Sequence, residues 1–225
     1  MAHPMNSASP GAKSDMSSLN KRRSAASSDM EKKFAQGQRL QSRDRFAEAE
    51  ARFRKVLASD PAHIGALTGL TRCLIALRRE QDAISLIDRA AADAGDNEPY
   101  LVELGGLCAT IKYLDQARAL YERALALNPD ATLTLINLAT VVDEQGETQM
   151  AVDLLSRAIE LQPLSAQAYG NLGKVLTGTL LFDEALACYQ RAIELDPTHS
   201  QSYTNMGALL EIIGRHNDAL SALQK

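Results

Sequence analysis

The sequence of 225 residues predicts an all-α protein, a solenoid of stacked antiparallel helix hairpins. Two observations carry this prediction. A pattern repeats every 34 residues without insertion, as Asn137, Asn171 and Asn205 show in the closely similar contexts TLINLAT, AYGNLGK and SYTNMGA. Within each period, two stretches place apolar residues three and four positions apart, the spacing of one helix face. Other series keep the same period, among them Ala49, Ala83, Ala117, Ala151, Ala185 and Ala219.

The first 29 residues differ from the rest of the chain. They are rich in Ser, Ala, Asn and Gly and contain no apolar run, so we expect them to be disordered. No apolar segment is suitable for a secretory signal or a membrane span, which predicts a cytoplasmic protein, with a nuclear location also open. The cluster Lys21-Arg22-Arg23 could be a localisation signal, although so short a cluster more often only adds solvated charge.

The repeats are expected to form one domain over residues 30–225. Placed in register, they cover 30–63, 64–97, 98–131, 132–165, 166–199 and 200–225, and the last is incomplete. The sequence stops inside the second helix of the sixth repeat, where a solenoid usually has a polar cap. We therefore expect the sequence to be a fragment of a longer protein or the product of an incomplete gene.

Repeat 166–199 illustrates the predicted hairpin. Its first apolar stripe is Tyr169, Leu172 and Leu176, and its second includes Ala185 and Tyr189. Small residues such as Gly173 and Ala185 should allow the two helices to approach closely, because larger side chains would force them apart.

The ends of its second helix are marked by polar residues and proline. Asp183 is expected to cap the start of the helix. The pair Asp196-Pro197 should end it, because the residue before a proline is disfavoured in the α conformation.

These residues carry a resemblance to the tetratricopeptide repeat (TPR), whose period is 34 residues. Repeat 166–199 shows the pattern most fully, with Tyr169, Leu172, Gly173, Ala185, Tyr189, Ala192 and Pro197. The resemblance covers residues 30–225. It implies a right-handed TPR superhelix in which the first helix of every repeat lines a concave groove. Some repeats depart from the pattern, with Thr71 and Ala139 in the glycine place, Gly95 in the proline place and Gln36 in the leucine place.

No active site is evident from the residues. The three cysteines, Cys73, Cys108 and Cys188, show no C-x-x-C spacing and are expected to be small buried residues of a reducing compartment. His63 and His199 occupy equivalent loop positions, where helix capping is the expected role. Because no His/Cys cluster has metal-ligand spacing, we expect neither metal nor cofactor.

The carboxylates are interpreted as solvated charge rather than catalytic pairs. The net charge of −4 at pH 7 becomes −6 over the repeats alone, which does not favour nucleic acid or anionic membranes. No small-molecule substrate is indicated either. The prediction is a non-catalytic scaffold that binds partner proteins or extended peptides.

The resemblance places the candidate peptide-binding residues in the groove. They are Asn137, Asn171 and Asn205, together with Lys174, Thr140 and Thr204, and their groove neighbours include Ile136 and Gly170. A carboxamide offers both donors and an acceptor, so a column of Asn residues can hold the main chain of a peptide. The alternative is that the asparagines only bond neighbouring repeats. The carboxylate clamp of chaperone-binding TPR domains is not continued at Thr204 and Ala208.

A second function remains open. The column of asparagines, absent at Ala35 and Gly69, also resembles the repeat arm of O-linked N-acetylglucosamine transferases and their SPINDLY-like relatives. In that case the chain would be the substrate-recognition arm of a glycosyltransferase whose catalytic domain is not in this sequence.

Overall fold

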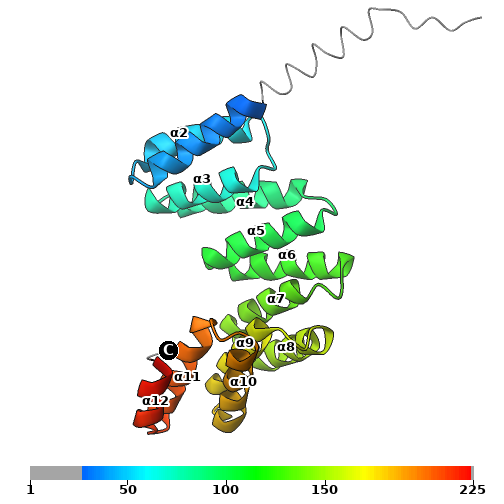
Figure 1. Cartoon of the computed structure of the whole chain (residues 1–225). Coiled ribbons are helices and arrows are strands. Elements are labelled where there is room, and N and C mark those ends of the chain that lie inside the picture. The colour runs from blue at the N-terminus through cyan, green and yellow to red at the C-terminus, as the bar shows by residue number, and fades with distance from the viewer. Residues whose placement is uncertain (1–26, 224–225) are drawn as a thin grey trace, which may run out of the picture. The chain divides into compact units, whose positions relative to one another are not determined.

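The structure is a computed structural model and describes residues 27–223. Its regular structure is entirely α-helical over that range, in consecutive helix pairs, which confirms the predicted all-α class (Figure 1). The chain divides into two compact bodies, Met1–Ala90 and Ala91–Lys225. We call their described parts, residues 27–90 and 91–223, the N-terminal body and the C-terminal body. The predicted disorder of residues 1–29 falls mostly outside the described residues, and residues 27–29 are helical.

The N-terminal body contains a helix that covers residues 27–41, then α2 (Phe46–Leu57), α3 (Ile64–Ala76) and most of α4 (Glu80–Asp93). Its core is built around Phe53 of α2, which is fully buried. The Phe53 ring fills the space beside Gly37 and Gly69, since a Cβ added at Gly69 would lie 2.4 Å from the ring. Glu50 joins α2 to the start of α4 through an ion pair with Arg79, with 3.0 Å between the charged atoms.

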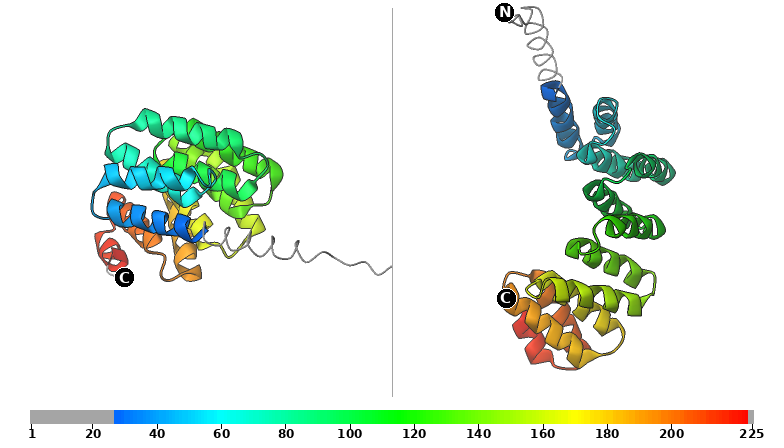
Figure 2. Two further views of the ribbon diagram at one scale, coloured as in Figure 1. Left: turned by 90° about the horizontal axis from the view of Figure 1, so that it is seen from above. Right: turned by 90° about the vertical axis from the view of Figure 1, so that its right-hand side faces the viewer.

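The C-terminal body continues with four hairpins. Their helices are α5 (Glu98–Thr110) and α6 (Leu114–Leu127), α7 (Thr132–Glu144) and α8 (Thr148–Leu161), α9 (Ala166–Gly178) and α10 (Phe182–Leu195), and α11 (Ser200–Ile212) and α12 (His216–Leu223). Each odd-numbered helix packs along the even-numbered helix that follows it, as the two views of Figure 2 show. α10 ends at Leu195, directly before Asp196-Pro197, as predicted.

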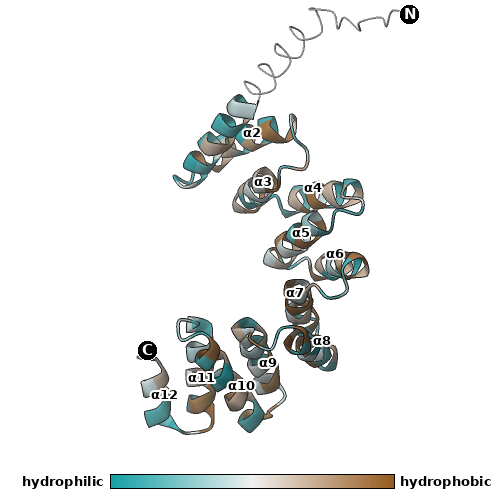
Figure 3. Cartoon of the chain, turned by 45° about the vertical axis from the view of Figure 1, so that its right-hand side comes forward, coloured by the Kyte–Doolittle hydropathy of each residue, from teal (hydrophilic) through white to brown (hydrophobic). Residues whose placement is uncertain are grey.

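The odd-numbered helices of the C-terminal body also contact one another. α5 packs on α7, α7 on α9, and α9 on α11. Among the described residues of this body, successive even-numbered helices do not pack together to the same extent. The body therefore curves with α5, α7, α9 and α11 on the inside of the bend, which can be followed in Figure 3.

Aromatic rings fill the space left by glycine at the helix crossings. A Cβ added at Gly173 would lie 2.7 Å from the ring of Tyr189 and 3.1 Å from the carbonyl oxygen of Ala185. Gly105 has the same relation to Tyr121, also at 2.7 Å. The predicted close approach is therefore correct for Gly173 and Ala185, but most of the space is taken by the aromatic ring of the same hairpin.

The turn inside every hairpin has the same backbone conformation. One residue per hairpin has a left-handed φ, between 57° and 87°, and these residues recur every 34 positions: Asp44, Arg78, Lys112, Gly146, Leu180 and Gly214. The next amide closes the helix with a hydrogen bond to the carbonyl five residues back, as Leu181 N–H does to the Leu176 carbonyl at 3.1 Å. This is the Schellman arrangement that satisfies the last carbonyl groups of a helix.

Helix starts are capped less regularly than helix ends. His63 and Asn97 each accept a hydrogen bond from the amide three residues on, at 3.1 and 3.2 Å, and Ser165 does the same. His199 instead contacts the Ser202 hydroxyl at 2.7 Å. The prediction that Asp183 caps α10 is wrong, because the cap position is Leu181 and Asp183 lies inside the first turn. There it still interacts favourably with the helix dipole.

Two of the three cysteines, Cys73 and Cys188, are free thiols. Cys73 and Cys108 are buried, as predicted, whereas Cys188 is only half-buried. Burial, together with the nearby Glu50 carboxylate, raises the pKa of the Cys73 thiol to about 11. Since the thiolate is the nucleophilic form, Cys73 is unreactive at neutral pH.

Candidate peptide-binding groove

The inner wall is the candidate site. We define it as the solvent-accessible side chains of α5, α7, α9 and α11. Each of these helices uses one side for its hairpin partner and its flanks for the neighbouring odd-numbered helices. The side that remains accessible therefore faces the inside of the bend. Figure 3 shows how these four helices follow one another along the C-terminal body.

Asn137, Asn171 and Asn205 lie at equivalent places on α7, α9 and α11, and all three are half-buried. Asn171 is tied to the neighbouring helix, because its Nδ2 donates to Thr140 Oγ1 at 3.4 Å. Thr140 in turn donates to the Ile136 carbonyl at 3.1 Å. This chain of contacts fixes the Asn171 amide and leaves its carbonyl oxygen available to a ligand.

The other two asparagines differ from Asn171. Asn205 Oδ1 accepts from Gln201 Nε2 at 2.8 Å within α11, which leaves its amide hydrogens available. Among residues 27–223, the Asn137 side chain has no hydrogen-bond partner. Asn137 therefore presents both a donor and an acceptor to the inside of the bend. The three asparagines are therefore not equivalent. Asn137, on α7, has the most hydrogen-bonding groups available to a ligand.

Lys174 and the two threonines complete the predicted set. Lys174 is exposed and lies 3.9 Å from Asp143 Oδ2, at the limit of an ion pair. Thr140 is half-buried between α7 and α9, as its bond with Asn171 requires. Thr204 is exposed, and its hydroxyl donates to the Ser200 carbonyl at 3.0 Å. All six predicted residues thus belong to the odd-numbered helices.

Two of their expected neighbours do not reach the surface. Ile136 is 2% exposed and forms part of the core. Gly170 is buried, since a Cβ there would lie 2.9 Å from Ser202 Oγ and 3.0 Å from the His199 ring. Each of these residues directly precedes an asparagine of the column. Adjacent positions of an α-helix differ by about 100° of rotation, so these two positions face the next hairpin. Their expected place on the wall is therefore wrong.

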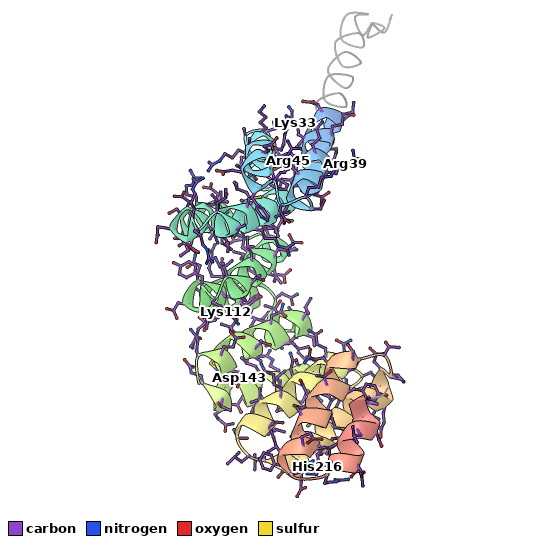
Figure 4. All side chains as sticks on the ribbon, turned by 90° about the vertical axis from the view of Figure 1, so that its left-hand side faces the viewer. Lys33, Arg39, Arg45, Lys112, Asp143 and His216 are labelled. Carbon is purple, nitrogen blue, oxygen red and sulfur yellow. The ribbon has the colours of Figure 1, made fainter. Side chains whose placement is uncertain are left out.

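The sequence places Glu103 in the groove, whereas Asp143 and Glu144 are interpreted from it only as solvated charge. Glu103 on α5 occupies the place that Asn137 has on α7, and it is exposed. Glu144 pairs with Lys112 at 2.7 Å, and Glu211 contacts His216 at 2.9 Å. Lys112, Asp143 and His216 are labelled in Figure 4. Comparing how the arginines are distributed over the helices would have shown that these carboxylates have few cations beside them.

Other kinds of site are not found in the part of the chain that the structure describes. Over residues 27–223 no group of three or more His, Cys, Asp and Glu side chains is arranged to hold a metal ion. In the same range, every helix is too short or too polar to cross a bilayer.

Solved structures with similar folds are TPR proteins in the same size range. A crystal structure of MamA aligns with 84% of this chain and 90% of its own chain, at 21% identity and a TM-score of 0.50. MamA from Desulfovibrio magneticus RS-1, from residue 41 to its end, aligns with 72% of this chain and 91% of its own, at 17% identity and a TM-score of 0.55. PilF from Pseudomonas aeruginosa aligns with 86% and 88%, at 17% identity and a TM-score of 0.58. These identities show a shared fold and nothing further.

Family comparison gives a consistent result along the chain. A search of curated protein sequences finds no match. Four family models, each described as a tetratricopeptide repeat, match residues 40–104, 113–166, 166–199 and 188–221. The third of these spans the same residues as the repeat in which the pattern is most complete. Together with the paired helices of both bodies, these matches identify the chain as a member of the tetratricopeptide repeat family.

Proposed function

We propose that this protein is a non-catalytic scaffold that binds an extended segment of a partner protein along the inner wall. The observation that carries the proposal is Asn137, whose carboxamide faces the inside of the bend without a partner among the described residues. TPR proteins typically bind proteins or peptides, which supports the same function.

The unequal asparagines indicate how a peptide would be held. Asn137 can bond both the N–H and the C=O of one peptide residue. Asn171 can add a bond through its carbonyl oxygen and Asn205 one through its amide, since their other groups are occupied. Such bonds contact the main chain, so they hold many sequences. Each net hydrogen bond contributes about 1 kcal/mol, so three of them give affinity only together with buried apolar surface.

The experiment compares Asn→Ala variants of the full chain. An array of synthetic 12-residue peptides identifies binders, and fluorescence polarisation measures their affinity. We expect Asn137→Ala to weaken binding five- to tenfold and Asn171→Ala to weaken it less, with melting temperatures close to that of the original protein. Asn128→Ala, the same change at an exposed position beyond α6, is the control and should leave affinity unchanged. Unchanged affinity together with a large loss of stability in Asn137→Ala would show a structural role instead.

A second candidate uses the same wall. The column of asparagines favours the substrate-recognition arm of an O-linked N-acetylglucosamine transferase, in which the peptide would be presented to a separate catalytic domain. The gene sequence downstream of Lys225 tests this candidate. A sugar-nucleotide-binding α/β domain there would replace the scaffold proposal, whereas a stop codon or further repeats would reject the enzyme.

The cysteines favour a reducing compartment. Cys73 and Cys188 are free thiols, as expected of a protein from a reducing environment. We infer that the protein is cytoplasmic, with the nucleus as the alternative, and cell fractionation with an antibody distinguishes the two.

A further inference from the structure

Charge is distributed very unevenly between the two bodies. Residues 27–90 contain 12 basic and 9 acidic residues, a net charge of +3. Residues 91–223 contain 7 basic and 18 acidic residues, a net charge of −11. The overall value of −4 conceals this difference, and so does the division between the N-terminal segment and the repeats. A body with so much charge of one sign attracts ligands of the opposite sign over a distance of several ångströms.

Within the C-terminal body, the cations avoid the inner wall. The even-numbered helices carry the arginines Arg118, Arg123, Arg157 and Arg191. The odd-numbered helices contain no arginine, and their one cation is Lys174. Their carboxylates are Glu98, Glu103, Asp143, Glu144 and Glu211. The inner wall is therefore acidic and poor in internal counter-charges.

Two carboxylates of the wall, Glu103 and Asp143, have little neutralisation from neighbouring cations. Glu103 is exposed and has no ion-pair partner among residues 27–223. Asp143 has only the 3.9 Å contact with Lys174, and its side chain is 21% exposed. Glu144, by contrast, is held by Lys112 at 2.7 Å. A cationic ligand would gain most beside Glu103 and Asp143, on the helices that carry and precede Asn137.

We propose that the inner wall selects extended peptide segments that carry Lys or Arg, with Glu103 and Asp143 as the residues that recognise the positive side chains. This inference rests on the proposed function, because Asn137 would hold the main chain between them. The occupant is a segment of a partner protein. Side chains on one face of an extended peptide recur every two residues, so basic residues at alternate positions suit a surface whose acidic groups come from successive helices.

Three 12-residue peptides with blocked ends test the selection. They share one sequence except at three alternate positions, which carry Lys, Gln or Glu. Fluorescence polarisation with the full chain should show the Lys peptide binding at least tenfold more tightly than the Gln peptide, and the Glu peptide more weakly than either. The advantage of Lys should shrink as NaCl is raised from 50 to 500 mM, because salt screens exposed charges. Equal affinity for the Lys and Gln peptides would overturn the inference.

Variants then locate the selection. Glu103→Gln and Asp143→Asn should each lower the affinity for the Lys peptide about threefold or more while leaving the Gln peptide unchanged. The double variant Asp183→Asn/Glu184→Gln removes two carboxylates from exposed positions of α10, an even-numbered helix, and serves as the control. If the control weakens Lys-peptide binding as much as the wall variants do, the selection reflects overall charge and the inference fails.

The proposed function and this inference can fail separately. If Asn137→Ala weakens all three peptides and Glu103→Gln weakens none, the main-chain grip stands and charge selection is rejected. If the Lys peptide binds but Asn137→Ala has no effect, the main-chain grip is rejected. The basic residues of the N-terminal segment provide a further comparison. A tenfold gain in Lys-peptide affinity on changing Lys21, Arg22 and Arg23 to Gln would make that segment the occupant, and would overturn the choice of a partner protein.

Discussion

The N-terminal and C-terminal bodies use the same packing contacts but expose different surfaces. Phe53 covers Gly37 in one body as Tyr189 covers Gly173 in the other, and both have left-handed turns at the same place in the period. Their net charges, +3 and −11, have opposite signs. The 34-residue period thus constrains the buried positions and the turns, while the exposed positions are free to differ. Residues with a function are therefore expected among the exposed positions, where the two bodies differ.

The largest expected effect comes from removing the aromatic ring. Phe53→Ala should lower the free energy of unfolding by about 3–5 kcal/mol, because it leaves a large cavity in a fully buried site. Tyr189→Ala should cost a similar amount in the C-terminal body, which makes this a test of the shared packing. Urea denaturation measures both. Leu220→Ala, at a side chain that is 57% exposed, is the control. A Phe53→Ala cost below that of the control would show that the two bodies are not built alike.

The next effect comes from filling the space beside a ring. Gly173→Ala should destabilise by about 1–3 kcal/mol, because the new methyl group meets both Tyr189 and the Ala185 backbone. Gly178→Ala, where nothing lies within 4 Å, should be neutral. Thermal denaturation of the two variants gives the difference. Equal melting temperatures would mean that the helices shift apart without cost.

A third test uses a buried hydroxyl without a hydrogen-bond partner, which among the described residues lies in the N-terminal body. Thr71 is fully buried, and its Oγ1 has no hydrogen-bond partner among the described residues. Thr71→Val keeps the shape and removes the hydroxyl, so it should stabilise by about 1 kcal/mol. Thr177→Val in the C-terminal body should have the opposite sign, because Thr177 donates to the Gly173 carbonyl at 2.8 Å. The urea midpoints show whether each variant is more or less stable than the original protein. A loss of stability in both variants would contradict the interpretation that the Thr71 hydroxyl is unsatisfied.

A smaller effect is expected in the turns. Leu180 has φ 64° and is 72% exposed. Leu180→Gly relieves the unfavourable left-handed conformation but makes the unfolded chain more flexible, so a net gain of about 0.5 kcal/mol is expected. Gly146→Ala, at the equivalent turn with φ 87°, should lose about 1 kcal/mol. Destabilisation by both changes would show that the Leu180 side chain has a packing role.

A last effect is a pH dependence that is confined to high pH. Burial raises the pKa of Cys73 to about 11 and that of Tyr121 to about 12, from ordinary values of 9.0 and 10.0. The folded protein keeps these protons after the unfolded chain has lost them, so stability is full below pH 9 and falls as the pH rises through 11 and 12. Cys73→Ala should flatten the part of the fall between pH 9 and 11. An unchanged profile in urea titrations would assign the fall to the C-terminal body.

The sequence predicted the helix pairs because several buried positions, such as Phe53, Tyr121 and Tyr189, share one period. It did not predict the recurring left-handed turns, because only Gly146 and Gly214 are glycines and the other turn residues have nothing in common. Asp183 was misplaced because an acidic residue is favourable both at a cap and in the first turn. For the candidate wall, residue order identified the asparagines, but the bonds that occupy Asn171 and Asn205 depend on contacts between helices and within a turn of helix. Ile136 was misplaced by one residue of helix rotation.

The recurrence of the left-handed residue has a practical consequence for building new proteins from this chain. Because the backbone turns in the same way at Asp44, Lys112 and Leu180, despite unrelated side chains, a block of 34 residues that is cut at these turns begins and ends in equivalent geometry. Blocks can then be deleted, duplicated or exchanged as interchangeable parts. A chimaera that carries two copies of residues 132–165 would lengthen the wall by one asparagine while leaving every joint unaltered.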